Sequence, residues 1–160
     1  MSSDVLLEVM TDIGKRSDTF CDLYLQRSTG HFATLEAGKL EELASGVIQG
    51  CGFRLLRGSE THFGHIHRTM TSAVMELISD IVEPLGLSPK LPSASQEELP
   101  ITNEETPIID VAILWELNKI VSQESKFIKK VTLKLSASQK EIAIFTSRGD
   151  LVHETRYLSR

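Results

Sequence analysis

The sequence predicts an α+β fold in which antiparallel β-meanders are flanked by helices. Short segments rich in apolar or alternating side chains, separated by glycine-containing turns, fill residues 20–67 and again residues 126–158. Patterns with apolar residues three and four positions apart come before and after the first group of segments. Because short connections join neighbouring strands in antiparallel order, we expect each group to form a meander.

The first meander is expected to contain about five strands. Alternation of polar and apolar side chains predicts the first strand, and Ser28-Thr29-Gly30 has the composition of a turn that ends it. The predicted strands are residues 20–27, 31–36, 39–44, 52–57 and 61–67. Arg54 alternates with apolar neighbours, so we expect its side chain to reach a surface carboxylate or a partner.

Three glycines lie at the predicted turns between strands. Gly38 follows Ala37, Gly58 precedes Ser59-Glu60, and Gly149 lies within Arg148-Gly149-Asp150. Glycine adopts a positive φ without the steric cost that other residues pay. We therefore expect these three glycines to permit the turn geometry.

Helices are predicted over residues 4–15 and 69–83, each with an apolar stripe that needs a sheet face to cover it. Thr69 is suited to cap the second helix, and Pro84 to stop it. A third helix is predicted from Thr106-Pro107 to about Gln123. Its apolar residues surround most of the helix, which predicts burial on more than one side.

All five prolines lie between Pro84 and Pro107, where serine and glutamate are also frequent. This composition predicts an exposed linker at residues 86–105, with an ordered surface loop as the alternative. The expected organisation is a helix, meander and helix at residues 1–85, the linker, and a helix with about three strands at residues 106–160. We expect 1–85 and 106–160 to form one composite domain.

The second meander is predicted from strands at residues 126–136, 141–147 and 151–158. The last of these ends close to residue 160 and would be an exposed edge. This predicts either a missing continuation or a partner that covers the edge. The alternative is an edge protected by His153, Glu154 and Arg156.

Composition limits the classes of function. The chain has 160 residues, a formal charge of −5 and no basic stripe, so nucleic acid is not an expected partner. No apolar stretch approaches the ~20 residues of a membrane helix, and no export signal is recognisable, so a cytoplasmic location is expected. In that reducing compartment Cys21 and Cys51 are expected to be free, buried thiols.

The residues indicate no catalytic, cofactor-binding or metal site in this chain. His65 and His67 would share one face of a strand, with His62 on the other, and they would bind zinc only if His31 or His153 supplied a third ligand. Histidines on an exposed strand face are the plainer interpretation.

Three pairs of adjacent acids are expected to be solvated surface: Glu41/Glu42, Glu97/Glu98 and Glu104/Glu105. No phosphate-binding loop or nucleophile elbow occurs in the sequence.

The order of several segments resembles the N-terminal domain of the TldD/PmbA family. Phe20–Gln26 contains an Asp-Leu-Tyr core, Leu35–Glu42 places a basic and acidic pair after Gly38, and Gly50–Leu55 contains Gly-Phe-Arg before Phe63-Gly64. The alternating apolar residues of 131–135 and the segment 142–149 resemble the later half of that domain. The likeness extends from Phe20 to Leu158.

The resemblance implies a cytoplasmic family of metallopeptidases, also described as modulators of DNA gyrase, that process peptides as dimers of related subunits. It implies zinc in a His-Glu-x-x-x-His helix of a separate catalytic domain, a motif absent from this chain. The implied function is therefore an inactive N-terminal domain that supports a peptide channel and subunit assembly. The expected partners are a homologous subunit or a separate catalytic domain, and a peptide.

The alternative is an autonomous module that binds a peptide or protein at its exposed last strand.

Overall fold

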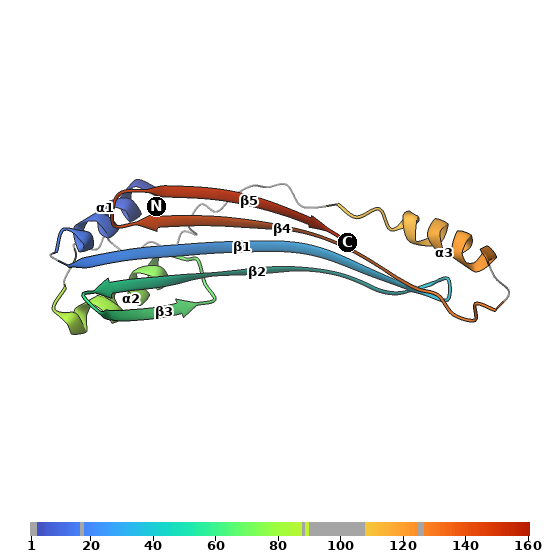
Figure 1. The fold of residues 1–160 in the computed structure, drawn as a ribbon, viewed down its shortest axis with the longest axis horizontal. Helices are drawn as coiled ribbons and strands as arrows, with labels where there is room; N and C mark the ends of the chain where they lie inside the picture. Colours follow the sequence, from blue (N-terminus) through green and yellow to red (C-terminus); the bar gives the residue numbers. More distant parts are fainter. Residues whose placement is uncertain (1–2, 17, 88, 90–107, 125–126) are drawn as a thin grey trace. The chain divides into compact units, whose positions relative to one another are not determined.

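The computed structural model describes residues 3–16, 18–87, 89, 108–124 and 127–160. The elements are α1 (Ser3–Gly14), β1 (Thr19–Glu36), β2 (Lys39–Arg57), β3 (Glu60–Ile66), α2 (Thr71–Val82), the short 3-10 helix η1 (Glu83–Leu85), α3 (Ala112–Glu124), β4 (Thr132–Thr146) and β5 (Leu151–Ser159) (Figure 1). The strands form one five-stranded sheet in the order β3-β2-β1-β4-β5, which confirms the α+β class with antiparallel strands. Among the described residues, no helix combines the length and apolar character needed to cross a membrane.

The strands are longer and fewer than the sequence predicts. The expected turn at Ser28-Thr29-Gly30 is wrong, because β1 continues through it to Glu36. Likewise β2 joins the strands expected at 39–44 and 52–57, and β4 joins the two expected on either side of residue 138. The sheet order places β1 between β2 and β4. The backbone N–H and C=O groups of Ser28-Thr29-Gly30 can therefore pair on both sides, whereas a turn there would leave them unpaired.

The turns between these long strands agree with the predicted positions. Gly38, Gly58 and Gly149 have φ angles of 79°, 57° and 87°, which confirms the expected role of the three glycines. Ala37 also has a positive φ, of 48°, so this hairpin turn places two successive residues in the left-handed region.

The chain forms two compact units that interleave along the sequence. Unit 1 comprises Met1–Arg27, Ile48–Asn103 and Glu141–Glu154, and unit 2 comprises Ser28–Val47, Glu104–Lys140 and Thr155–Arg160. In unit 1, apolar residues of α1 and α2 pack with alternate residues of the strands, such as Leu23, Phe53 and Phe145. Both helices therefore cover the same face of this part of the sheet, as their apolar stripes predict (Figure 1).

The start of α2 differs from the prediction. The residue that precedes the helix is Met70, in an extended conformation with no side-chain cap, rather than Thr69. Thr69 lies one residue before this position and is buried. After α2, the chain makes the 3-10 turn that contains Pro84 and ends at Gly86 with a φ of 70°.

Unit 2 has a much smaller core. Its fully buried apolar residues are Ala33, Leu35 and Leu114, and Leu114 is the single buried residue of α3. The expectation that this helix is buried on more than one side is therefore wrong, because the described part of unit 2 offers it one small apolar surface. The helix begins at Ala112, whose N–H donates to the Asp110 carboxylate, while Thr106-Pro107 and most of the expected linker lie outside the described residues.

Candidate functional site

We call the face of the unit 1 sheet that points away from α1 and α2, and that no described helix of unit 1 covers, the open face. Along β1, Cys21, Leu23 and Leu25 are buried against the helices, so the residues between them point to the open face. Polar and aromatic side chains, among them Asp22 and Tyr24, therefore lie on this face.

Three interactions organise side chains on the open face. Arg54 donates from Nε to Oδ2 of Asp22 at 3.0 Å, which confirms the expected contact of this arginine with a surface carboxylate. The guanidinium of Arg148 lies 5.4 Å from the ring centre of Phe20. Tyr24 donates its hydroxyl hydrogen to Oε1 of Gln26 at 2.9 Å.

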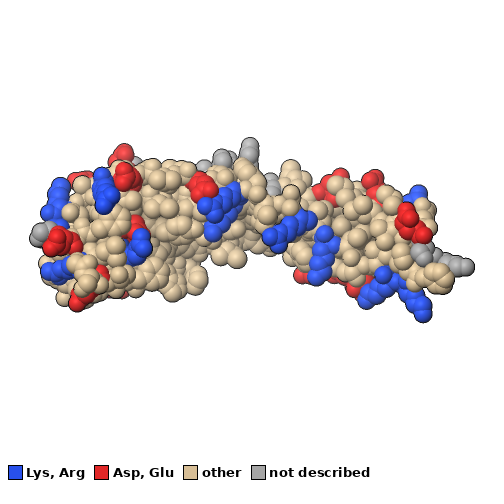
Figure 2. Space-filling view, in the orientation of Figure 1, with Lys and Arg blue, Asp and Glu red and all other residues tan. Residues whose placement is uncertain are grey.

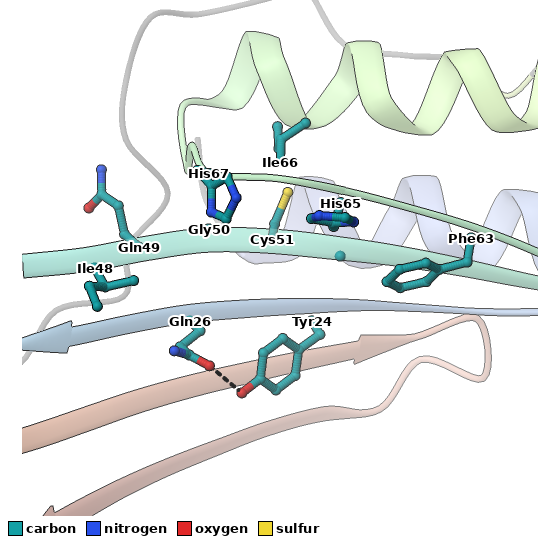
Figure 3. Close-up of a pocket in the computed structure, with 11 residues that line it drawn as sticks. Tyr24, Gln26, Ile48, Gln49, Gly50, Cys51, Phe63, His65, Ile66 and His67 are labelled. Atoms are coloured by element: carbon teal, nitrogen blue, oxygen red, sulfur yellow. Dashed lines mark hydrogen bonds between the residues drawn. The ribbon is translucent and has the colours of Figure 1, made fainter.

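A groove with a volume of about 350 Å³ lies on this face of unit 1. Figure 3 shows Tyr24 and Gln26 of β1 along one side and Phe63 and His65 of β3 along the other, with β2 between them. Residues 48–52 of β2 form the floor of the groove.

Two glycines in β2 allow close packing at the base of the groove. A Cβ atom on Gly52 would lie 3.3 Å from Cε2 of Phe63, and one on Gly50 would lie 2.6 Å from the carbonyl oxygen of Ile66. In the register of the hairpin, Gly52 faces His65. Neither position therefore has room for a side chain, because the ring of Phe63 packs against Gly52 and the backbone of Ile66 lies against Gly50.

The histidine pair expected on one strand face is present. The ring centres of His65 and His67 are 5.9 Å apart in an edge-on arrangement, and His65 stacks on Phe63 with ring centres also 5.9 Å apart. His62 points the other way, with Nε2 3.5 Å from a Glu60 carboxylate oxygen. Among the described residues, no three His, Cys, Asp or Glu side chains come together, so neither His31 nor His153 completes a zinc site there. The described residues thus do not fit the catalytic zinc of a peptidase.

Both cysteines are free and buried, as predicted. Burial away from water raises the pKa of Cys21 to about 12, against a smaller opposing effect of its hydrogen bond with Ser147. Burial also raises the pKa of Cys51 to about 12, opposed in part by a backbone hydrogen bond with Ile66. Burial thus disfavours the thiolate, the reactive species, at both cysteines.

The sequence prediction missed the groove although it contained a signal for it. Gly50 and Gly52 were separated by one residue in a segment expected to hold a strand boundary, and glycine within a strand often marks a close approach by a ligand. The register that places Phe63 and Tyr24 on either side of them depends on pairing between separate segments, which sequence spacing does not specify.

Residues 21–83 match the family model of PmbA/TldA metallopeptidase domain 1. The chain is 21% identical over 171 residues to the Metalloprotease TldD homolog of Haemophilus influenzae. That alignment covers 100% of this chain and 36% of the relative, so the chain spans little more than a third of the length of this curated protein.

Solved structures share the fold. TldE from Thermococcus kodakarensis superposes with a TM-score of 0.71 at 18% identity, over 97% of this chain and 37% of TldE. A protein from Bacteroides thetaiotaomicron assigned as a modulator of DNA gyrase superposes with a TM-score of 0.64 at 11% identity, over 98% of this chain and 39% of that protein.

The segment 21–83 is thus similar to the first domain of PmbA/TldA metallopeptidases, and the chain shares the fold of the solved structures. The resemblance expected from the sequence, to the N-terminal domain of the TldD/PmbA family, is thereby confirmed.

Proposed function

We propose that this chain acts as a non-catalytic N-terminal domain in peptide processing, where it supports a substrate channel and the assembly of subunits. The observation that carries the proposal is the match of residues 21–83 to the first domain of a metallopeptidase, in a chain that spans 36% of its curated relative. The catalytic metal, proposed to be zinc, would be held by a separate domain or by a homologous subunit.

The open face of unit 1 supports a role in peptide contact. It offers a groove of about 350 Å³, with no Asp, Glu, Lys or Arg among its described lining residues, beside two aromatic side chains, Tyr24 and Phe63. Figure 2 shows Lys and Arg interspersed with Asp and Glu on the face in view, which favours a peptide over nucleic acid as the partner. A cytoplasmic location and the organisation of 1–85 with 106–160 as one composite domain are parts of the same proposal.

A second candidate function is an autonomous module that binds a peptide or protein along β5. This strand is the last in the sheet order, with β4 on one side only, and an edge strand can pair with an added strand. Val152, Tyr157 and Leu158 on β5 are 52%, 60% and 52% exposed. A strand added at this edge would cover these apolar side chains and remove them from water.

Peptide hydrolysis by the native protein tests the main proposal. We expect the form isolated from its source to hydrolyse unstructured peptides and to lose this activity with a zinc chelator, while the 160-residue chain alone is inactive. Chelator-sensitive hydrolysis by the chain alone would contradict a non-catalytic role. A native form that neither binds nor cleaves peptides would remove the peptide-processing role.

The two candidate functions differ in their response to charges on the β5 edge. If the edge binds the partner, Val152→Lys and Leu158→Lys should abolish peptide binding. If the peptide contacts the groove of unit 1, the same variants should bind normally.

A further inference from the structure

We propose that the groove over Gly50 and Gly52 binds a neutral aromatic side chain of an extended peptide. This inference rests on the proposed function and specifies the kind of peptide segment that the open face would accept. It is carried by the shape of the groove, the rings around it and its lack of charge.

The shape of the groove fits a single side chain better than a folded surface. Its volume of about 350 Å³ is at the lower end of the range for small-ligand sites. Gly52 lets the ring of Phe63 pack against the backbone of β2, since a Cβ there would lie 3.3 Å from Cε2 of that ring. An inserted ring would therefore lie beside the Phe63 ring, on the side that faces Tyr24.

The rings around the groove favour an aromatic guest. Phe63 and His65 are stacked with an interplanar angle of 24°, and Tyr24 lies on the opposite side of the groove (Figure 3). Aromatic pairs gain stability beyond area burial when they stack with an offset or meet edge to face. The Phe63 side chain is 62% exposed, so a guest ring would also remove apolar surface from water.

The charge of the groove disfavours ionised guests. Its described lining contains no Asp, Glu, Lys or Arg. The charged groups of Asp22 and Arg54, on the same face, are paired with each other. A carboxylate or ammonium in the groove would lose hydration and meet only the imidazoles of His65 and His67, whereas a phenyl or phenol ring has no charge to desolvate.

Binding of matched peptides to the full chain tests the inference. The probes are fluorescein-labelled eight-residue unstructured peptides that differ only in a central Phe, Leu, Lys or Glu, and the measurement is fluorescence anisotropy. We expect the Phe peptide to bind about five-fold more tightly than the others, as one added aromatic contact allows. Equal affinities, or a Leu peptide that binds as tightly as the Phe peptide, would overturn the inference.

Variants locate the preference in the groove. Gly52→Val would displace the Phe63 ring that packs against residue 52, and Phe63→Ala removes that ring; each should reduce the ratio of Phe to Lys affinity to about one. Gly46→Ala is the matched control, because Gly46 is in the same strand and a Cβ there has nothing within 4 Å. A preference that survives Phe63→Ala, or that Gly46→Ala also removes, would contradict the assignment.

If a second copy of the chain occupies the groove, the chain should self-associate, Gly52→Val should abolish that association, and no peptide should bind. This result would also overturn the inference.

Hydrolysis by the native form separates this inference from the proposed function. Hydrolysis with no preference for Phe would refute the aromatic site and leave the proposed function standing. A Phe preference in binding without hydrolysis would support the aromatic site and refute the proposed function.

Discussion

A Cβ atom on Gly14 would lie 2.5 Å from the Cβ of Ser147 and 2.9 Å from its carbonyl oxygen. Gly14 is the last residue of α1, and Ser147 comes directly after β4. Ser147 is held in place by Cys21, since its N–H donates to the Cys21 carbonyl at 2.8 Å and its Oγ accepts from the Cys21 N–H at 3.0 Å. The end of α1 can therefore approach the sheet only because residue 14 has no side chain.

Gly14→Ala should destabilise the protein by about 1–3 kcal/mol, the usual cost of an overpacked contact. The direction of the change in the free energy of unfolding is informative, because Gly→Ala at an unhindered helical position would stabilise the protein by about 0.5–1 kcal/mol. Urea denaturation gives the difference in free energy of unfolding. Gly46→Ala, with open space around the new Cβ, is the control and should stay within about 0.5 kcal/mol of wild type. A stabilised Gly14→Ala would show that the helix end does not contact Ser147.

The two thiols should be unreactive in the folded protein. Because the pKa of each is raised to about 12, the thiolate that attacks a disulfide reagent is scarce at pH 8 and also buried. With an aromatic disulfide reagent at pH 8, we expect no colour on mixing and two thiols per chain after unfolding in urea. Cys21→Ala and Cys51→Ala assign any early reaction, and a fast thiol in the folded state would contradict the burial of that cysteine.

Stability should also fall in alkaline solution because of these cysteines. The folded pKa of about 12 lies above the ordinary 9.0, so the folded state retains protons that the unfolded state loses. The contribution is complete below pH 9 and decreases as the pH rises from 9 toward 12. The urea midpoint measured from pH 8 to 11 should therefore fall more steeply for wild type than for the double variant Cys21→Ala/Cys51→Ala.

Leu114→Ala should loosen α3. Leu114 is 2% exposed and is the single buried residue of this helix, so its truncation removes the main apolar contact with Ala33 and Leu35. We expect a cost of about 2 kcal/mol or more and faster hydrogen exchange of the α3 amides. Leu117, 42% exposed on the same helix, is the matched control, and Leu117→Ala should cost less than about 1 kcal/mol. Equal effects of the two variants would contradict this packing.

Glu36 should titrate below its usual range. A hydrogen bond from Lys130 is the largest cause that lowers the pKa of this carboxyl, and the charge of Lys130 and a hydrogen bond from Thr132 add to it. Carboxyl-detected NMR titration should show Lys130→Ala raising the pKa of Glu36, with Lys129→Ala as a neighbouring control that leaves it unchanged. The folded pKa is lowered, so the stabilisation is present above the ordinary value of 4.5 and is lost as the pH falls below it.

Several features could be predicted from local sequence because local geometry determines them. The apolar stripe of α1, with Leu6, Val9, Met10 and Ile13, follows from helical periodicity, and these are the helix residues that the structure buries. The hairpin turns at Gly38 and Gly58 follow from the ease with which glycine adopts a positive φ. The contact of Arg54 with a surface carboxylate follows from strand alternation, although the partner, Asp22, is 32 residues away.

Only the tertiary structure decided where the strands end and which residues line the groove. Gly30 carries a turn-like neighbourhood in the sequence, yet it continues β1, because backbone pairing with neighbouring strands outweighs a weak local preference for a turn. The groove likewise depends on the register that sets Gly52 opposite His65 and places Phe63 and Tyr24 on either side. Sequence periodicity specifies the face on which a side chain lies, but pairing between distant segments determines which side chains become neighbours.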